Sequence, residues 1–101
     1  MLIRIVRLTF KPEATEQFLA MFHNTKERIR NFEGCHHLEL WQDQQKPNVM
    51  TTCSHWQSAE ALEAYRMSDL FQTTWKQTKI LFADKPQAHS YQQAVLVEGN
   101  N

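Results

Sequence analysis

Three aromatic side chains with hydrogen-bonding ability are the strongest candidates for binding a small molecule: Trp56, Tyr65 and Trp75. Flat rings stack on a flat ligand, while the indole N–H and the phenol hydroxyl can bond its oxygens. Phe71, one helical turn before Trp75, extends the aromatic surface. These side chains predict a site for a flat aromatic ligand, although an aromatic stripe at helical spacing is also typical of a hydrophobic core.

Two polar candidates lie in strand-like segments. His36 alternates with Leu38 and Leu40, so we expect it on their face of the strand. There it either lines a cavity, as a general base near neutral pH, or is a core histidine bonded to the backbone. Thr52 precedes Trp56 by four residues on the same strand face and can donate or accept one hydrogen bond.

Metal and nucleotide chemistry are not expected from spacing and composition. No two of the five histidines have the four-residue helical spacing of a zinc site, and no Cys-x-x-Cys motif occurs. A phosphate-binding loop needs several glycines, whereas the chain has only Gly34 and Gly99. The sequence therefore predicts neither a metal nor a nucleotide cofactor.

Size and charge restrict the class of protein. The chain has 101 residues, 42% of them hydrophobic, which suits one globular domain; we expect residues 1–97 to form it and residues 98–101 to be a flexible tail. Basic and acidic residues balance at 11 each, so nucleic-acid binding is not expected. No apolar run is long enough to span a membrane, and no signal peptide is evident. With only two cysteines, we expect a reduced, cytoplasmic protein.

Hydrophobic periodicity predicts the elements that position these residues. Strands are expected at 2–9, 36–42, 49–56 and 88–97, and helices at 12–31, 59–66 and 70–82. The order β-α-β-β-α-β predicts an α+β, ferredoxin-like domain with a four-stranded antiparallel sheet. Helices cover only one face of such a sheet, yet the first and last strands carry apolar residues on both faces. We therefore expect a homodimer that covers the second face.

A series of short motifs between residues 31 and 71 carries a family resemblance. A glycine-containing turn is followed by a strand with Glu-Leu, a strand ending in Trp-x-Ser, an Ala-Leu helix and a Ser-x-x-Phe step. The residues in register are Gly34, Glu39, Leu40, Trp56, Ser58, Ala61, Leu62, Ser68 and Phe71. The pattern resembles the antibiotic biosynthesis monooxygenase (ABM) family, and the likeness runs from residue 1 to about residue 86.

The resemblance implies a dimeric α+β barrel and a monooxygenase that oxidises a small aromatic or quinol-like substrate without cofactor. Trp56 matches the tryptophan that lines the substrate cavity of cofactor-free members; together with the residue types above, we expect catalytic roles for Trp56, Tyr65 and His36, and substrate contacts from Thr52, Trp75 and Phe71. In this reading the substrate forms a stabilised carbanion that reacts with oxygen inside a dry pocket.

The chain also departs from the family pattern. Cofactor-free members carry asparagine where this chain has Thr52, and many quinone-processing relatives carry histidine where it has Tyr65. The haem-degrading members need asparagine, tryptophan and histidine where this chain has Val6, Tyr65 and Trp75, so haem binding is not expected. These departures keep a second reading open: a non-catalytic, dimeric small-ligand-binding or stress-associated protein.

Overall fold

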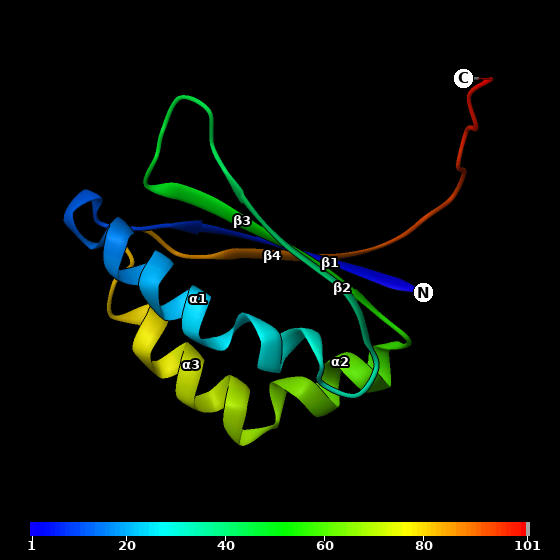
Figure 1. Ribbon diagram of the computed structural model, residues 1–101, viewed down its shortest axis with the longest axis horizontal. Coiled ribbons are helices and arrows are strands. Elements are labelled where there is room, and N and C mark those ends of the chain that lie inside the picture. The colour runs from blue at the N-terminus through cyan, green and yellow to red at the C-terminus, as the bar shows by residue number, and fades with distance from the viewer. Residues whose placement is uncertain (101) are drawn as a thin grey trace.

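Four strands form one antiparallel sheet, and the helices lie on one of its faces (Figure 1). The computed structural model describes residues 1–100. In chain order the elements are β1 (Leu2–Thr9), the 3₁₀ helix η1 (Pro12–Ala14), α1 (Thr15–Arg30), β2 (Cys35–Gln42), β3 (Val49–Trp56), α2 (Ala59–Arg66), α3 (Asp69–Lys79) and β4 (Gln87–Gln92). The strand order is β2-β3-β1-β4, so the predicted α+β ferredoxin-like fold is confirmed.

Sequence periodicity located β1, β3 and α2 at their observed bounds, but it extended the last strand too far. The predicted strand 88–97 ends at Gln92, the residue paired with Leu2 at the start of β1. As an edge strand, β4 pairs only with β1, so its pairing ends where β1 begins, at Leu2. The following segment leads away from the sheet in Figure 1, and Val95, Leu96 and Val97 are exposed.

Serine side chains cap the starts of both α2 and α3. The Ser58 hydroxyl accepts a hydrogen bond from the Ala61 N–H at 3.1 Å and starts α2. Ser68 accepts one from the Phe71 N–H at 3.1 Å and starts α3, while its hydroxyl donates to the Tyr65 carbonyl at 2.6 Å. Ser68 therefore fixes the end of one helix against the start of the next, which sets Tyr65 beside Phe71.

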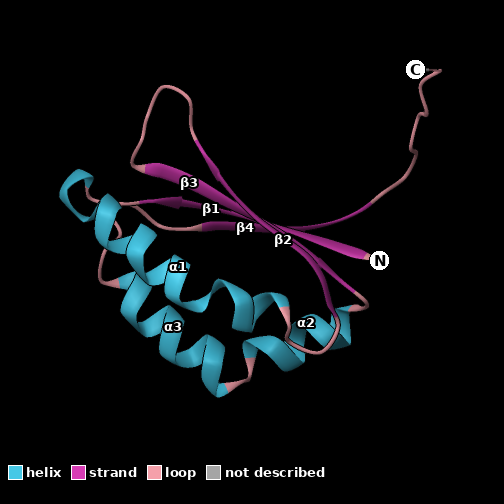
Figure 2. Cartoon of the chain, viewed as in Figure 1, coloured by secondary structure: helices cyan, strands magenta, loops and turns pink. Residues whose placement is uncertain are grey.

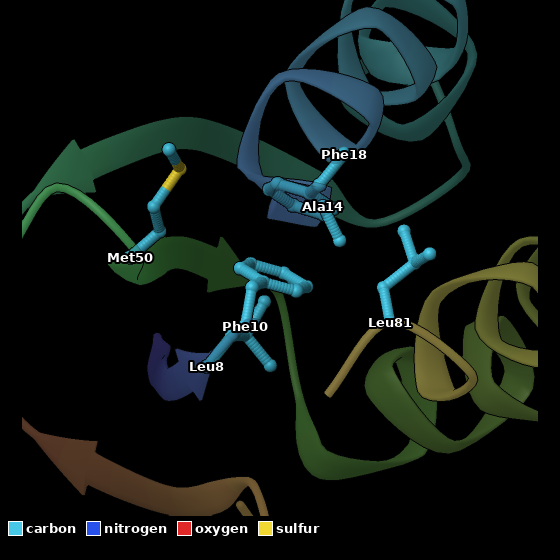
Figure 3. Packing of buried hydrophobic residues seen from close by; sticks show 6 residues of the cluster. All are labelled: Leu8, Phe10, Ala14, Phe18, Met50 and Leu81. Carbon is cyan, nitrogen blue, oxygen red and sulfur yellow. The ribbon is translucent and has the colours of Figure 1, made fainter. Parts of the chain in front are cut away.

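The core consists of two separate clusters of buried side chains. The larger one lies where β1 and β3 meet η1, α1 and the end of α3 (Figure 3), and contains Leu8, Phe10, Ala14, Phe18, Met50 and Leu81. The smaller one contains Cys35, Trp56 and Leu62, with Leu2, Phe32, Ala61 and Tyr65 packed against it. Strand β1 runs from the smaller cluster at Leu2 to the larger one at Leu8.

The other face of the sheet carries no helix (Figure 2). Ile3 and Ile5 alternate with the helix-facing residues of β1 and are only partly buried. Trp41 on β2 and Tyr91 on β4 are 45% and 52% exposed. We call this surface the open face of the sheet. None of the helices among residues 1–100 combines the length and apolarity needed to cross a bilayer.

Candidate functional site

A cavity of about 280 Å³ lies between the helix-covered face of the sheet and the three α-helices. Its lining takes residues from both core clusters, so it occupies the space between them. The lining residues are Arg4, Val6, Leu8, Phe18, Phe22, Ile29, Leu38, Thr52, Ser54, Trp56, Leu62, Tyr65, Arg66, Phe71, Thr74, Trp75, Thr78, Pro86 and Ala88. Five of the six predicted site residues are therefore brought together in one cavity.

Trp56 forms a fixed wall of this cavity at the end of β3. Its side chain is 1% exposed, and its indole N–H donates a 2.9 Å hydrogen bond to the Ser54 hydroxyl. Ser54 lies two residues earlier on the same strand face and was not predicted as a site residue. Because the indole N–H is bonded to Ser54, Trp56 contributes apolar ring surface to the cavity lining and no hydrogen-bond donor.

Tyr65 offers the polar contact that Trp56 does not. Within residues 1–100 no protein partner is found for its hydroxyl, and no buried side-chain polar atom lacks a partner. The hydroxyl is therefore accessible from the cavity. Burial, followed by the charge of Cys35, raises the pKa of Tyr65 above its ordinary value. The phenol thus stays protonated and acts as a hydrogen-bond donor rather than as a base.

Aromatic rings continue along the helical side of the cavity. The ring of Tyr65 meets Phe71 edge to face at 5.2 Å, and Phe71 stacks on Trp75 at 5.7 Å with an 11° interplanar angle. The caps at Ser58 and Ser68 set these helices, so the wall is held by backbone geometry as well as by ring contacts. The predicted aromatic surface exists as one connected wall.

Polar side chains occupy the floor of the cavity on the sheet. Thr52 and Ser54 lie on the helix-facing side of β3, paired with Val6 and Arg4 of β1 respectively. Arg4 and Arg66 are the charged members of the lining and were not predicted as site residues. The Nη1 of Arg4 donates a 3.0 Å hydrogen bond to the Ser90 hydroxyl on β4.

His36 does not line the cavity, contrary to the expectation from alternation. The pairing of β2 with β3 shifts between Cys35 and His37, so two residues of β2 stand where β3 has one. This irregularity removes His36 from the series of Leu38 and Leu40. Its exposed ring bonds the Gln57 side chain at 2.9 Å.

Metal-ligand and thiol chemistry gain no support from the described residues. Within residues 1–100, no group of three or more histidine, cysteine, aspartate or glutamate side chains is placed to hold a metal ion. Cys35 and Cys53 are free and buried, and burial raises the pKa of both thiols. A raised pKa disfavours the nucleophilic thiolate.

Comparisons with known proteins agree with the predicted family. The family model for antibiotic biosynthesis monooxygenase matches residues 1–77. No curated protein matches the chain. The crystal structure of an antibiotic biosynthesis monooxygenase is similar, with a TM-score of 0.88 and 20% identity over 94% of this chain and 100% of that one.

Two further solved structures share the fold. A conserved protein from Methanosarcina mazei Go1 has a TM-score of 0.85 and 21% identity, over 92% of this chain and 93% of that one. Rv0793 from Mycobacterium tuberculosis has a TM-score of 0.86 and 16% identity, over 96% of this chain and 98% of that one. At such identities these likenesses concern the fold alone.

Proposed function

The chain belongs to the antibiotic biosynthesis monooxygenase family, and we propose that it is a cofactor-independent monooxygenase acting on a small aromatic or quinol-like substrate. The observation that carries this proposal is the cavity itself. Its aromatic wall, formed by Trp56, Tyr65, Phe71 and Trp75, faces polar floor residues across a space suited to a ring-shaped ligand.

The proposed reaction converts a ring methylene into a carbonyl. The substrate loses a proton to give a carbanion stabilised as an enolate, and its carbon forms a bond to molecular oxygen. Loss of water from the resulting hydroperoxide leaves the carbonyl, so one oxygen atom enters the product and the other enters water. The protein orients the ring and excludes bulk water.

Each residue has a defined task in this proposal. Trp56, Phe71 and Trp75 hold the ring by stacking. The Tyr65 hydroxyl donates a hydrogen bond to the enolate oxygen, which bears more charge in the transition state than in the substrate. Thr52 bonds a second ring oxygen. His36 has no task here, because its ring lies outside the cavity lining.

A second candidate is a non-catalytic small-ligand-binding protein with the same cavity. The observation that favours it is the absence of a carboxylate or an imidazole from the described cavity lining. Without such a base, removal of the substrate proton falls to solvent or to a substrate acidic enough to ionise unaided. The two candidates share a ligand class and differ in turnover.

Turnover under isotopically labelled oxygen distinguishes the monooxygenase from the non-catalytic binding protein. Protein stripped of metals with a chelator is mixed with an anthrone, and oxygen uptake and quinone formation are followed. We expect one labelled atom in the quinone and a rate well above that without protein, retained by the matched surface variant Arg28→Met. Binding of the anthrone with no acceleration of its oxidation would reject the monooxygenase and leave the binding protein.

We also propose that the protein is a homodimer built through the open face of the sheet. Ile3, Ile5, Trp41 and Tyr91 give this face an apolar character that a second sheet would cover. Sedimentation equilibrium at micromolar concentration should give twice the 12.0 kDa chain mass, and a single 12.0 kDa species would reject the dimer.

The free thiols suit a reducing compartment, so we propose the cytoplasm.

A further inference from the structure

The charge of the cavity is one-sided. Arg4 and Arg66 line it, and no aspartate or glutamate is found among the described lining residues. The chain as a whole is neutral, with 11 basic and 11 acidic residues. Two positive charges therefore line a cavity whose other described lining residues are uncharged.

Arg4 is the more unusual of the two. It interrupts the apolar series Leu2, Val6 and Leu8 on the helix-covered face of β1, where a leucine or valine would complete the core. It donates a hydrogen bond to the neutral Ser90 hydroxyl, and none of the ion pairs within residues 1–100 includes it. Burial, followed by the positive charge of Arg66, lowers the pKa of Arg4. Its surroundings thus disfavour the charge that it carries.

Arg66 approaches the cavity from the last turn of α2. Its Nη1 bonds the Glu63 carboxylate on the same helix at 3.2 Å, with both side chains about half exposed. An exposed ion pair of this kind contributes little to stability, so Arg66 can exchange Glu63 for a ligand anion at little cost. Arg66 directly follows Tyr65, so the second cation lies next to the residue that offers a free hydroxyl to the cavity.

We propose that the cavity binds a planar aromatic carboxylate, with the ring against the aromatic wall and the carboxylate between Arg4 and Arg66. Guanidinium groups bind carboxylates through paired, charge-assisted hydrogen bonds, and an anion here would offset the repulsion between the two cations. Among the anionic groups of small aromatics, a carboxylate is already ionised at neutral pH, whereas a phenol with a pKa near 10 is not. The inference rests on the proposed function in using the same cavity for an aromatic ligand.

Arg4 also joins β1 to β4 through Ser90, so the test must separate ligand binding from sheet stability. Naphthoate and naphthamide share ring and shape and differ in charge. Their affinities are measured anaerobically by calorimetry for the wild type, Arg4→Met and Arg66→Met, with thermal unfolding recorded for each protein. Arg28→Met, which removes an exposed arginine of α1 outside the lining, is the matched control.

We expect the wild type and Arg28→Met to bind naphthoate about tenfold or more tightly than naphthamide, which is one decade for a difference of about 1.4 kcal/mol. Arg4→Met should remove this preference, and Arg66→Met should reduce it while leaving naphthamide binding unchanged. The ratio of the naphthoate affinity to the naphthamide affinity should fall as salt is added, because salt screens the charges. If Arg4→Met does not fold, Arg66→Met and the salt series decide the question.

Equal affinities of the wild type for both probes would overturn the carboxylate site and leave the aromatic cavity in place. A preference for naphthoate that survives in Arg66→Met and is insensitive to salt would also overturn it. Failure of both probes to bind would overturn it together with the proposed aromatic ligand. A charge preference in a protein that oxidises no anthrone would support the site and reject only the monooxygenase.

Discussion

Trp56 and Tyr65 stack on one another, with ring centroids 4.9 Å apart and ring planes inclined by 26°. The contact joins the end of β3 to the last turn of α2, so strand and helix together set the aromatic end of the cavity. The two residues contribute different groups to the cavity. Trp56 uses its N–H on Ser54 and presents a ring, whereas Tyr65 keeps its hydroxyl for a ligand.

Replacing Tyr65 by phenylalanine isolates that hydroxyl. Because no protein partner of the hydroxyl is found within residues 1–100, Tyr65→Phe should keep the melting temperature of the wild type. Loss of a transition-state hydrogen bond should lower the rate of anthrone oxidation about tenfold, equivalent to about 1.4 kcal/mol. Oxygen uptake at saturating and at limiting substrate checks this. Tyr91→Phe, on the open face, is the control, and an unchanged rate in Tyr65→Phe would contradict the role.

The buried phenol also predicts how stability changes in alkali. The pKa of Tyr65 is raised in the folded chain, so above the ordinary tyrosine pKa of about 10 the unfolded chain loses this proton and the folded chain keeps it. Stability is therefore fully present below pH 10 and falls as the pH rises beyond it. Denaturant unfolding across this range should show a steeper loss in the wild type than in Tyr65→Phe. Parallel curves for the two proteins would contradict this burial effect.

Replacing Trp56 by phenylalanine should lower the stability of the fold. Trp56→Phe removes a hydrogen bond, leaves the Ser54 hydroxyl without its donor and enlarges the cavity, for a loss of about 1–3 kcal/mol. Trp41, exposed in the single chain, is the matched control, and at concentrations where the chain is monomeric Trp41→Phe should change stability by no more than about 0.5 kcal/mol. Urea unfolding of the two variants gives the comparison. Equal losses would show that Trp56 is not fixed as described.

Gly34 packs closely against α2 and has a backbone conformation that favours glycine. Its φ of +88° lies in the left-handed region, and a Cβ placed on it would lie 2.6 Å from the Ala61 Cβ on α2. Gly34→Ala should therefore destabilise the protein by about 1–3 kcal/mol, whereas Gly99→Ala, with nothing nearby, should have no effect. Thermal unfolding of both variants tests this. The double variant Gly34→Ala with Ala61→Gly should recover only the part of the loss due to the clash, because the strained φ remains.

Much of the fold follows from periodicity, because it depends on local patterns. Strand β1 is a mostly apolar run rich in β-branched residues, α2 has a serine cap before its apolar residues, and both elements have their predicted bounds. The end of β4 could not be predicted in this way, since it depends on where its partner β1 begins. The apolar run from Ala94 to Val97 has strand-like residues but no neighbouring strand among residues 1–100 to pair with, and no local signal in the sequence records that.

The site was predictable where alternation holds and not where it breaks. Thr52 and Trp56 share a strand face, and that reasoning applied to β1 would have identified Arg4 among Leu2, Val6 and Leu8. His36 was misplaced because the irregular pairing with β3 reverses alternation at one point. Arg66 has no such signal, since a basic residue in the last turn of a helix is typical of solvent-exposed ends.

The three tryptophans occupy three different environments, and this makes the protein its own optical reporter. Trp56 is 1% exposed inside the wall, Trp75 borders the cavity, and Trp41 is 45% exposed on the open face. Indole emission shifts to longer wavelength with solvent contact, so Trp41 contributes the red part of the spectrum and should respond to dilution of a dimer. Ligand entry should instead quench the blue emission of Trp56 and Trp75. Occupancy and assembly can thus be followed separately in one unlabelled sample.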